Sequence, residues 1–156
     1  MLNGQKIELT SEQYQKVCNV VTSKKKTPFD RKEKDETYYF IDNVGIVDSV
    51  KDRGCVADDL RYGNANYCSN KELMVRRADY EALERVLWRF SEENGGRGVY
   101  FICYDKKIGN WAITETPAYI LLLGPTFCSK AIALGAIEEA KKWLRENGLK
   151  PEDVFF

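Results

Sequence analysis

The residues best suited to chemistry are two cysteines that stand in nearly the same four-residue word. Residues 67–70 read YCSN and residues 127–130 read FCSK, and a helical pattern follows each. A thiol at the N-terminus of a helix can have its pKa lowered, which makes it a better nucleophile. The competing interpretation is that Cys68 and Cys128 are small buried apolar residues. We favour burial, because the chain contains no histidine that could activate either thiol.

The absence of histidine narrows the chemistry further. It removes the Ser–His and Cys–His nucleophiles, the histidine metal sites and the usual general base near neutral pH. The five cysteines include no C-x-x-C pair, so neither a zinc cluster nor a disulfide framework is expected. Asp58 and Asp59 are followed by Arg61, which indicates an ion pair in a loop. We therefore expect no catalytic residue, no metal and no cofactor.

A basic stretch supplies the candidate binding residues. Its six cations are Lys24, Lys25, Lys26, Arg31, Lys32 and Lys34. A run of charge is usually a solvated surface. The alternative is an electrostatic contact with RNA, DNA or an acidic face of a protein.

The overall composition limits the classes of partner and compartment. The chain carries 24 basic and 24 acidic residues, so its net charge is zero. A general nucleic-acid binder usually has a clear excess of basic residues, and a DNA mimic needs an excess of acidic residues. The zero net charge therefore argues against both classes. The first 15 residues lack the apolar core of a secretory signal, and the run from Ala118 to Gly124 is too short to span a bilayer. We expect a protein of a reducing cytosol with no membrane contact.

The elements that would position these residues begin with a short helix over residues 11–21, capped by Thr10 and Gln13. Residues 23–37 follow as a charged linker or loop. A β-hairpin is predicted from residues 38–41 and 46–50, with a turn at DNVG. Residues 51–66 are expected to be irregular, with a short strand around 61–67. A long helix is predicted over residues 70–94, with Ser69 as its cap.

The second half repeats this order. Residues 98–113 contain a second hairpin, and AYILLLGPTF, from Ala118 to Phe127, is expected to be a strand. A second helix follows, with Ala133, Ala136, Ile137, Ala140 and Leu144 on one face. Gly148, Leu149 and Pro151 form a strong stop signal. The aromatic residues of both hairpins could stack on bases of a nucleic acid, but both faces of these strands are apolar, so core packing is expected.

Three landmarks recur in the same order, which indicates an internal duplication. They are YFI, then the aromatic-Cys-Ser word, then a tryptophan-bearing helix that ends in Asn-Gly. We predict an α+β fold with two degenerate hairpin–strand–helix repeats, which form one antiparallel sheet with the helices packed on one face. The predicted divisions are an N-terminal helix and basic linker (1–36), a first repeat (37–96) and a second repeat (97–156) within one compact domain.

Four segments of the chain resemble a set of small proteins from phages and prophages of Firmicutes. They are IELTSEQ, YYFIDNVGIV, RYGNANYCSNKEL and LERVLWRFSEENGG, and together they cover about residues 5–96. That set has no established catalytic residues, so the resemblance implies no functional residue. What it implies is a setting, namely a mobile genetic element inside a bacterial cytoplasm. Small accessory proteins in this setting often inhibit host defence, as anti-CRISPR proteins do.

The leading functional expectation follows from this setting. It is a non-enzymatic protein that inhibits a bacterial defence system by binding an effector protein, most plausibly a CRISPR nuclease. The alternative is a nucleic-acid-binding accessory protein that acts through the basic stretch. An enzyme that uses carboxylate or tyrosine groups ranks below both.

Overall fold

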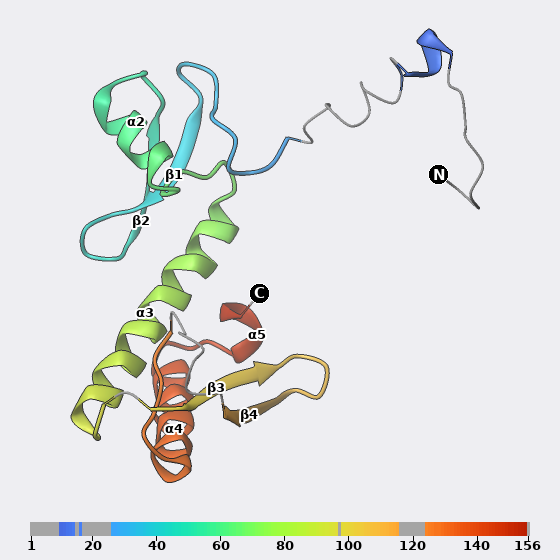
Figure 1. Ribbon diagram of the computed structural model, residues 1–156. Helices are drawn as coiled ribbons and strands as arrows, with labels where there is room; N and C mark the ends of the chain where they lie inside the picture. Colours follow the sequence, from blue (N-terminus) through green and yellow to red (C-terminus); the bar gives the residue numbers. More distant parts are fainter. Residues whose placement is uncertain (1–9, 15, 17–25, 97, 116–123, 156) are drawn as a thin grey trace.

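The computed structural model describes residues 10–14, 16, 26–96, 98–115 and 124–155, and it has an α+β fold as predicted (Figure 1). The first half contains β1 (Thr37–Ile41), β2 (Val47–Lys51), α2 (Val56–Gly63) and α3 (Lys71–Glu93). The second half contains β3 (Tyr100–Asp105), β4 (Asn110–Glu115), α4 (Lys130–Glu146) and α5 (Pro151–Val154).

Both predicted hairpins are present. Strands β1 and β2 pair in antiparallel register with Tyr39 opposite Ser49. Their turn uses the predicted residues, because the Asp42 carboxylate accepts the backbone N–H groups of Val44 and Ile46 and Gly45 has a φ of 90°. Strands β3 and β4 pair in the same sense, with Cys103 opposite Ala112.

The prediction of one continuous sheet is wrong, because the hairpins form two separate two-stranded sheets. The reason is the length of α3, which has 23 residues and is therefore about 34 Å long. Figure 1 shows the first hairpin beside the N-terminal half of α3 and the second hairpin near its C-terminal half. Strands must lie about 4.8 Å apart to share a ladder, and α3 holds the two hairpins well beyond that distance.

Helix α3 contributes to two hydrophobic cores. Near its start, Met74 and Ala78 pack with Ile41 and Cys68. Further along, Leu83 and Leu87 join a second and larger core. That second core is completed by residues of α4, the second hairpin and the C-terminus, among them Phe127, Ala136, Leu144 and Val154. The helix begins one residue later than predicted, because the side chain of Asn70, and not Ser69, accepts the N–H of Leu73 at 2.9 Å.

Helix α4 follows the sequence prediction closely. All five residues of its predicted apolar face are buried. Ser129 caps its start by accepting the N–H of Ile132. At its end, Leu149 donates its N–H to the carbonyl of Leu144, and Gly148 takes a φ of 67°, which is the expected left-handed stop. The chain then continues into α5, a short helix that the sequence analysis did not anticipate.

Helix α2 corrects the prediction of an irregular segment with a short strand. Asp58 explains why the helix forms, because its carboxylate accepts the backbone N–H of the N-cap residue Cys55 at 3.0 Å. It also accepts the Cys55 thiol at 3.1 Å. This arrangement is a capping box built on cysteine, a residue outside the usual N-cap set. Sequence rules for helix starts therefore overlook it.

In both halves, a short segment before the helix pairs with the first strand of the hairpin. The bridge joins Tyr39 to Cys68 in the first half and Tyr100 to Phe127 in the second. The sequence match aligns Cys68 with Cys128, so the structural match is displaced by one residue. A displacement of one residue in an extended segment sends side chains to the opposite face. Accordingly Cys68 is buried, whereas Cys128 is exposed and contradicts the predicted burial.

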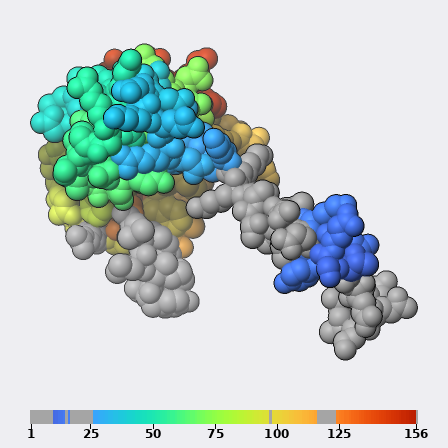
Figure 2. Space-filling model, turned by 90° about the horizontal axis from the view of Figure 1, so that it is seen from above, coloured from blue at the N-terminus to red at the C-terminus, as the bar shows by residue number. Residues whose placement is uncertain are grey.

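The start of the predicted N-terminal helix is present at Ser11–Tyr14, and its capping box is formed. Thr10 donates its N–H to the Gln13 side chain at 3.0 Å, and the Gln13 N–H donates to the Thr10 hydroxyl at 3.3 Å. Tyr14 is 61% exposed, so this part of the helix does not pack on the core. Figures 1 and 2 show these blue residues standing apart from the two hairpin units. The rest of the predicted helix stripe, Val17, Cys18 and Val21, lies outside the described residues.

Candidate functional site

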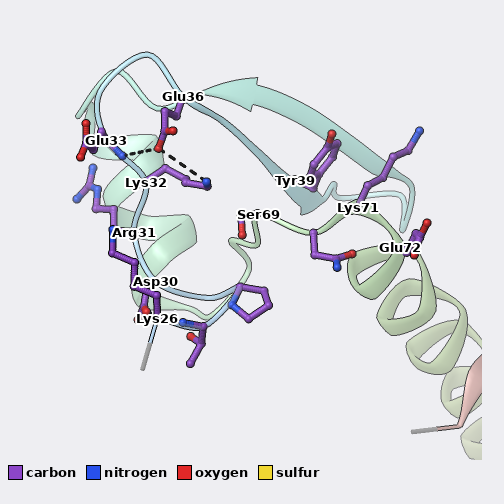
Figure 3. Close-up of a pocket in the computed structure, with 13 residues that line it drawn as sticks. Lys26, Asp30, Arg31, Lys32, Glu33, Glu36, Tyr39, Ser69, Lys71 and Glu72 are labelled. Carbon is purple, nitrogen blue, oxygen red and sulfur yellow. Dashed lines mark hydrogen bonds and ion pairs between the residues drawn. The ribbon is translucent and has the colours of Figure 1, made fainter. Parts of the chain in front are cut away.

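A polar groove lies between the loop over residues 26–36, strand β1 and the start of α3 (Figure 3). Its volume is about 820 Å³. Four cations line it, namely Lys26, Arg31, Lys32 and Lys71. Four carboxylates line it as well, namely Asp30, Glu33, Glu36 and Glu72. The groove therefore carries balanced charge, unlike the uniformly basic surface that a phosphate backbone requires.

The six candidate cations of the sequence analysis divide into three groups. Lys26, Arg31 and Lys32 line the groove. Lys34 is exposed and is not among the groove residues. Lys24 and Lys25 lie outside the residues that the structure describes. Only half of the predicted set is therefore shown at one site.

Arg31 is held by two carboxylates. Its guanidinium donates to both oxygens of Asp52, at 3.0 Å from Nε and 3.2 Å from Nη2, and its Nη1 donates to Asp59 at 2.6 Å. These bonds, first the one to Asp52, raise the pKa of Arg31 above its ordinary value. A guanidinium so occupied has few donors left for a phosphate. Arg31 thus attaches the loop to the first hairpin and to α2.

Asp52 is the centre of the first half of a buried polar network. It is 2% exposed and also accepts the Gly54 N–H at 2.8 Å and the Tyr67 hydroxyl at 3.0 Å. The hydrogen bond from Arg31 is the main cause that lowers the pKa of Asp52. The Tyr67 hydroxyl in turn accepts the backbone N–H of Lys32 at 2.9 Å. Burial raises the pKa of Tyr67 to about 12.

Asp58 is the centre of the second half of the network. It is 2% exposed and accepts the Tyr38 hydroxyl at 2.7 Å, besides the backbone N–H of Arg53 at 2.9 Å and the Cys55 groups described above. The bond from Tyr38 is the main cause that lowers the pKa of Asp58. Burial is the main cause that raises the pKa of Tyr38.

The two halves of the network meet through aromatic stacking. The rings of Tyr38 and Tyr67 lie parallel with their centroids 3.9 Å apart. Arg61 donates to the Tyr38 hydroxyl at 2.9 Å and lies 3.7 Å over the ring of Phe40. The sequence prediction of an ion pair between Arg61 and the neighbouring aspartates is therefore wrong, because Asp59 pairs with Arg31 instead.

The role of this buried network is to stabilise the fold of the first half. Its carboxylates stay ionised and its tyrosines stay protonated near neutral pH, so no member is suited to exchange a proton there. In the part of the chain that the structure describes, no buried side-chain nitrogen or oxygen lacks a hydrogen-bond partner. The network fixes the loop and α2 on the first hairpin, and it presents the groove on a rigid base.

Sequence reasoning missed Asp52, and it noted Tyr67 only as the aromatic residue of the YCSN word and not as a member of a polar network. Their signal is a pattern of contacts between residues distant in the chain, such as the separation of 21 residues between Arg31 and Asp52. The prediction of core packing is confirmed for Tyr38 and Phe40, which are 0% and 7% exposed.

Comparisons with known proteins give no relative for this chain: no family model, no curated protein and no solved structure matches it. Among residues 10–14, 16, 26–96, 98–115 and 124–155, no group of three or more metal-ligating side chains is placed to hold an ion. The same described residues include no helix that is both long and apolar enough to cross a bilayer.

Proposed function

We propose that this protein is a non-enzymatic binding protein that inhibits a bacterial defence system by covering a surface of an effector, with a CRISPR nuclease as the first candidate. The observation that carries the proposal is the state of the buried network. Its acids and tyrosines form hydrogen bonds with one another and with backbone groups. We infer that their role is to keep the binding surface rigid. The phage setting rests on the sequence resemblance.

The nature of the groove supports a protein partner over a nucleic acid. Protein interfaces have polar rims, in which charges of both signs can find partners. Binding to a nucleic-acid backbone instead needs unpaired cations, which replace the counterions condensed on the phosphates. Arg31 is ion-paired with Asp52 and Asp59, and Lys32 lies 3.8 Å from Glu36. Among the described groove residues, Lys26 and Lys71 are the cations outside the ion pairs of the structure. Two unpaired lysines are few for binding a phosphate backbone.

The test is co-purification of the tagged full-length protein with candidate effectors from Firmicutes cells, followed by a DNA cleavage assay. We expect the effector to co-purify and its cleavage rate to fall. Lys71→Glu in the groove should weaken binding about tenfold, equivalent to about 1.4 kcal/mol. The matched control is Lys106→Glu, which reverses an exposed lysine outside the groove. If no effector binds and phage survival is unchanged across several defence systems, the proposal fails.

A second measurement separates the nucleic-acid alternative. Fluorescent single- and double-stranded oligonucleotides are titrated with the protein at two salt concentrations. Our proposal expects no binding at low salt. Binding that weakens steeply as salt rises would instead favour phosphate contacts through the basic stretch.

A further inference from the structure

Helix α2 has its amphipathic pattern turned outward. Its buried residue is Asp58, while the aliphatic side chains of Val56 and Leu60 are 73% and 61% exposed. These two residues are four positions apart, so they lie next to each other on one face of the helix. Asp58 lies on the opposite face. A helix that is stabilised by burial would show the reverse arrangement.

Polar contacts explain how α2 keeps this orientation. Asp58 holds the start of the helix, and Asp59 is tied to Arg31 at 2.6 Å. Arg61 binds the Tyr38 hydroxyl from the last turn. The fold therefore uses the charged residues of α2 as its attachment and leaves the aliphatic pair free.

The aliphatic pair on α2 differs from the other exposed apolar residues. Ile46 and Ile108 lie beside the hairpin turns, and Leu134 stands on α4. Val56 and Leu60 instead form an i, i+4 pair on a helix, which is the spacing by which helices anchor in grooves of partner proteins. Figure 1 shows α2 at the outer end of the first half, away from α4 and the second hairpin.

The charges near this pair indicate the chemistry of the partner. Lys51 and Arg53 precede α2 and are exposed, and neither belongs to an ion pair of the described chain. The exposed acid of the helix, Asp59, shares the guanidinium of Arg31 with the buried Asp52. Residues 51–61 and Arg31 together hold four cations and three carboxylates, so the segment around the aliphatic pair carries a surplus of one positive charge. Carboxylates on the partner would complement this surplus.

We propose that α2 is a docking helix, which inserts Val56 and Leu60 into an apolar groove of a partner protein whose rim carries carboxylates. A second copy of this chain is a poorer occupant. A two-fold contact between copies through α2 would bring the exposed cations Lys51 and Arg53 of both chains towards each other. This inference rests on the proposed protein-binding function and names its anchor and the chemistry of its partner.

The experiment places a benzophenone amino acid at position 60 of the full-length protein, expressed in Firmicutes cells and activated by light. The matched control carries the same probe at Leu134, which is 54% exposed on α4. We expect an adduct with a different protein at position 60, at least about fivefold stronger than at position 134. Val56→Asp should abolish that adduct, and circular dichroism should show an unchanged fold. The cross-linked peptide should map beside clustered carboxylates.

A binding measurement with the purified cross-linked protein completes the test. Leu60→Asp should weaken the affinity about tenfold or more, Leu134→Asp less than about twofold, and higher salt should weaken the wild-type complex. If the partner of the wild-type protein binds Leu60→Asp equally well, α2 is not the anchor although the binding function stands. An adduct with a second copy, or one at a basic surface, overturns the stated occupant. If the wild-type protein captures nothing, the function and this inference fail together.

Discussion

Removing the hydroxyl of Tyr67 should destabilise the fold strongly for so small a change. The hydroxyl donates to the ionised Asp52 at 3.0 Å and accepts the Lys32 N–H at 2.9 Å. A hydrogen bond to a charged group contributes about 1.5–3 kcal/mol. The Lys32 N–H is partly buried and loses its acceptor, which adds roughly another 0.5–1 kcal/mol. We therefore expect Tyr67→Phe to lower the free energy of unfolding by about 2–4 kcal/mol.

The matched control is Tyr62→Phe. Tyr62 is 42% exposed, and its ring meets Tyr67 edge-on at 5.6 Å. The structure gives its hydroxyl no hydrogen bond within the described chain, so its removal should cost less than about 0.5 kcal/mol. Both phenylalanine variants keep their aromatic contacts, so the comparison isolates the hydroxyl group.

The assay is urea unfolding at pH 7, followed by far-ultraviolet circular dichroism and by tryptophan fluorescence. For a slope near 2 kcal/mol per molar urea, Tyr67→Phe should lower the midpoint by about 1–2 M. Of the three tryptophans, at positions 88, 111 and 143, Trp111 and Trp143 pack against the second core, so fluorescence reports mainly that core. Coincident shifts by both probes mean that the two cores unfold together. A midpoint for Tyr67→Phe within error of the Tyr62→Phe midpoint by both probes would refute the role of the network.

Three further predictions test other parts of the structure. The pKa of Asp58 is lower in the folded protein than in the unfolded chain. The ionised carboxylate therefore stabilises the fold above the unfolded pKa near 4, and this stabilisation is lost as pH falls through the folded pKa. In urea titrations, the difference in unfolding free energy between wild type and Asp58→Asn should shrink below about pH 4. In the native state Cys128 should react quickly with a thiol probe and Cys68 slowly, as read by mass spectrometry; equal rates would contradict the displaced register. A Cβ at Gly98 would lie 2.1 Å from a backbone oxygen, whereas Gly148 has open space around it and only a positive φ; Gly98→Ala should thus lower the thermal midpoint far more than Gly148→Ala, which should cost about 1–2 kcal/mol.

The helices were predictable where their stability is local. Helix α4 carries its cap, its alanine-rich face and its glycine stop within one continuous stretch, so each signal can be recognised from neighbouring residues. Helix α2 was not predictable, because its N-cap is a cysteine and its tertiary contacts come from Tyr38 and Arg31, both more than 15 residues away along the chain. Local patterns carry no information about such partners.

The arrangement of the two halves was only partly predictable. A hairpin and a helix follow each other in both halves, as predicted. The strand that was predicted before each helix is represented in the described residues only by an isolated bridge. The repeated words could not reveal that the pairing segments differ by one residue, since YCSN and FCSK align without a gap. The candidate site shows the same limit: the sequence indicated Lys26, Arg31 and Lys32, but not that Asp52 and Asp59 occupy Arg31.

The shared helix α3 also fixes a spacing. Its first part belongs to one core through Met74 and Ala78, and its later part to the other through Leu83 and Leu87. Each inserted residue between these parts would turn the second hairpin by about 100° about the helix axis and move it by about 1.5 Å. An insertion of seven residues would restore its direction to within about 20° and lengthen the separation by about 10 Å. Helix α3 therefore sets both the distance and the relative rotation of the two hairpins. A partner that contacts both hairpins would be more sensitive to the rotation that an insertion causes than to the added length.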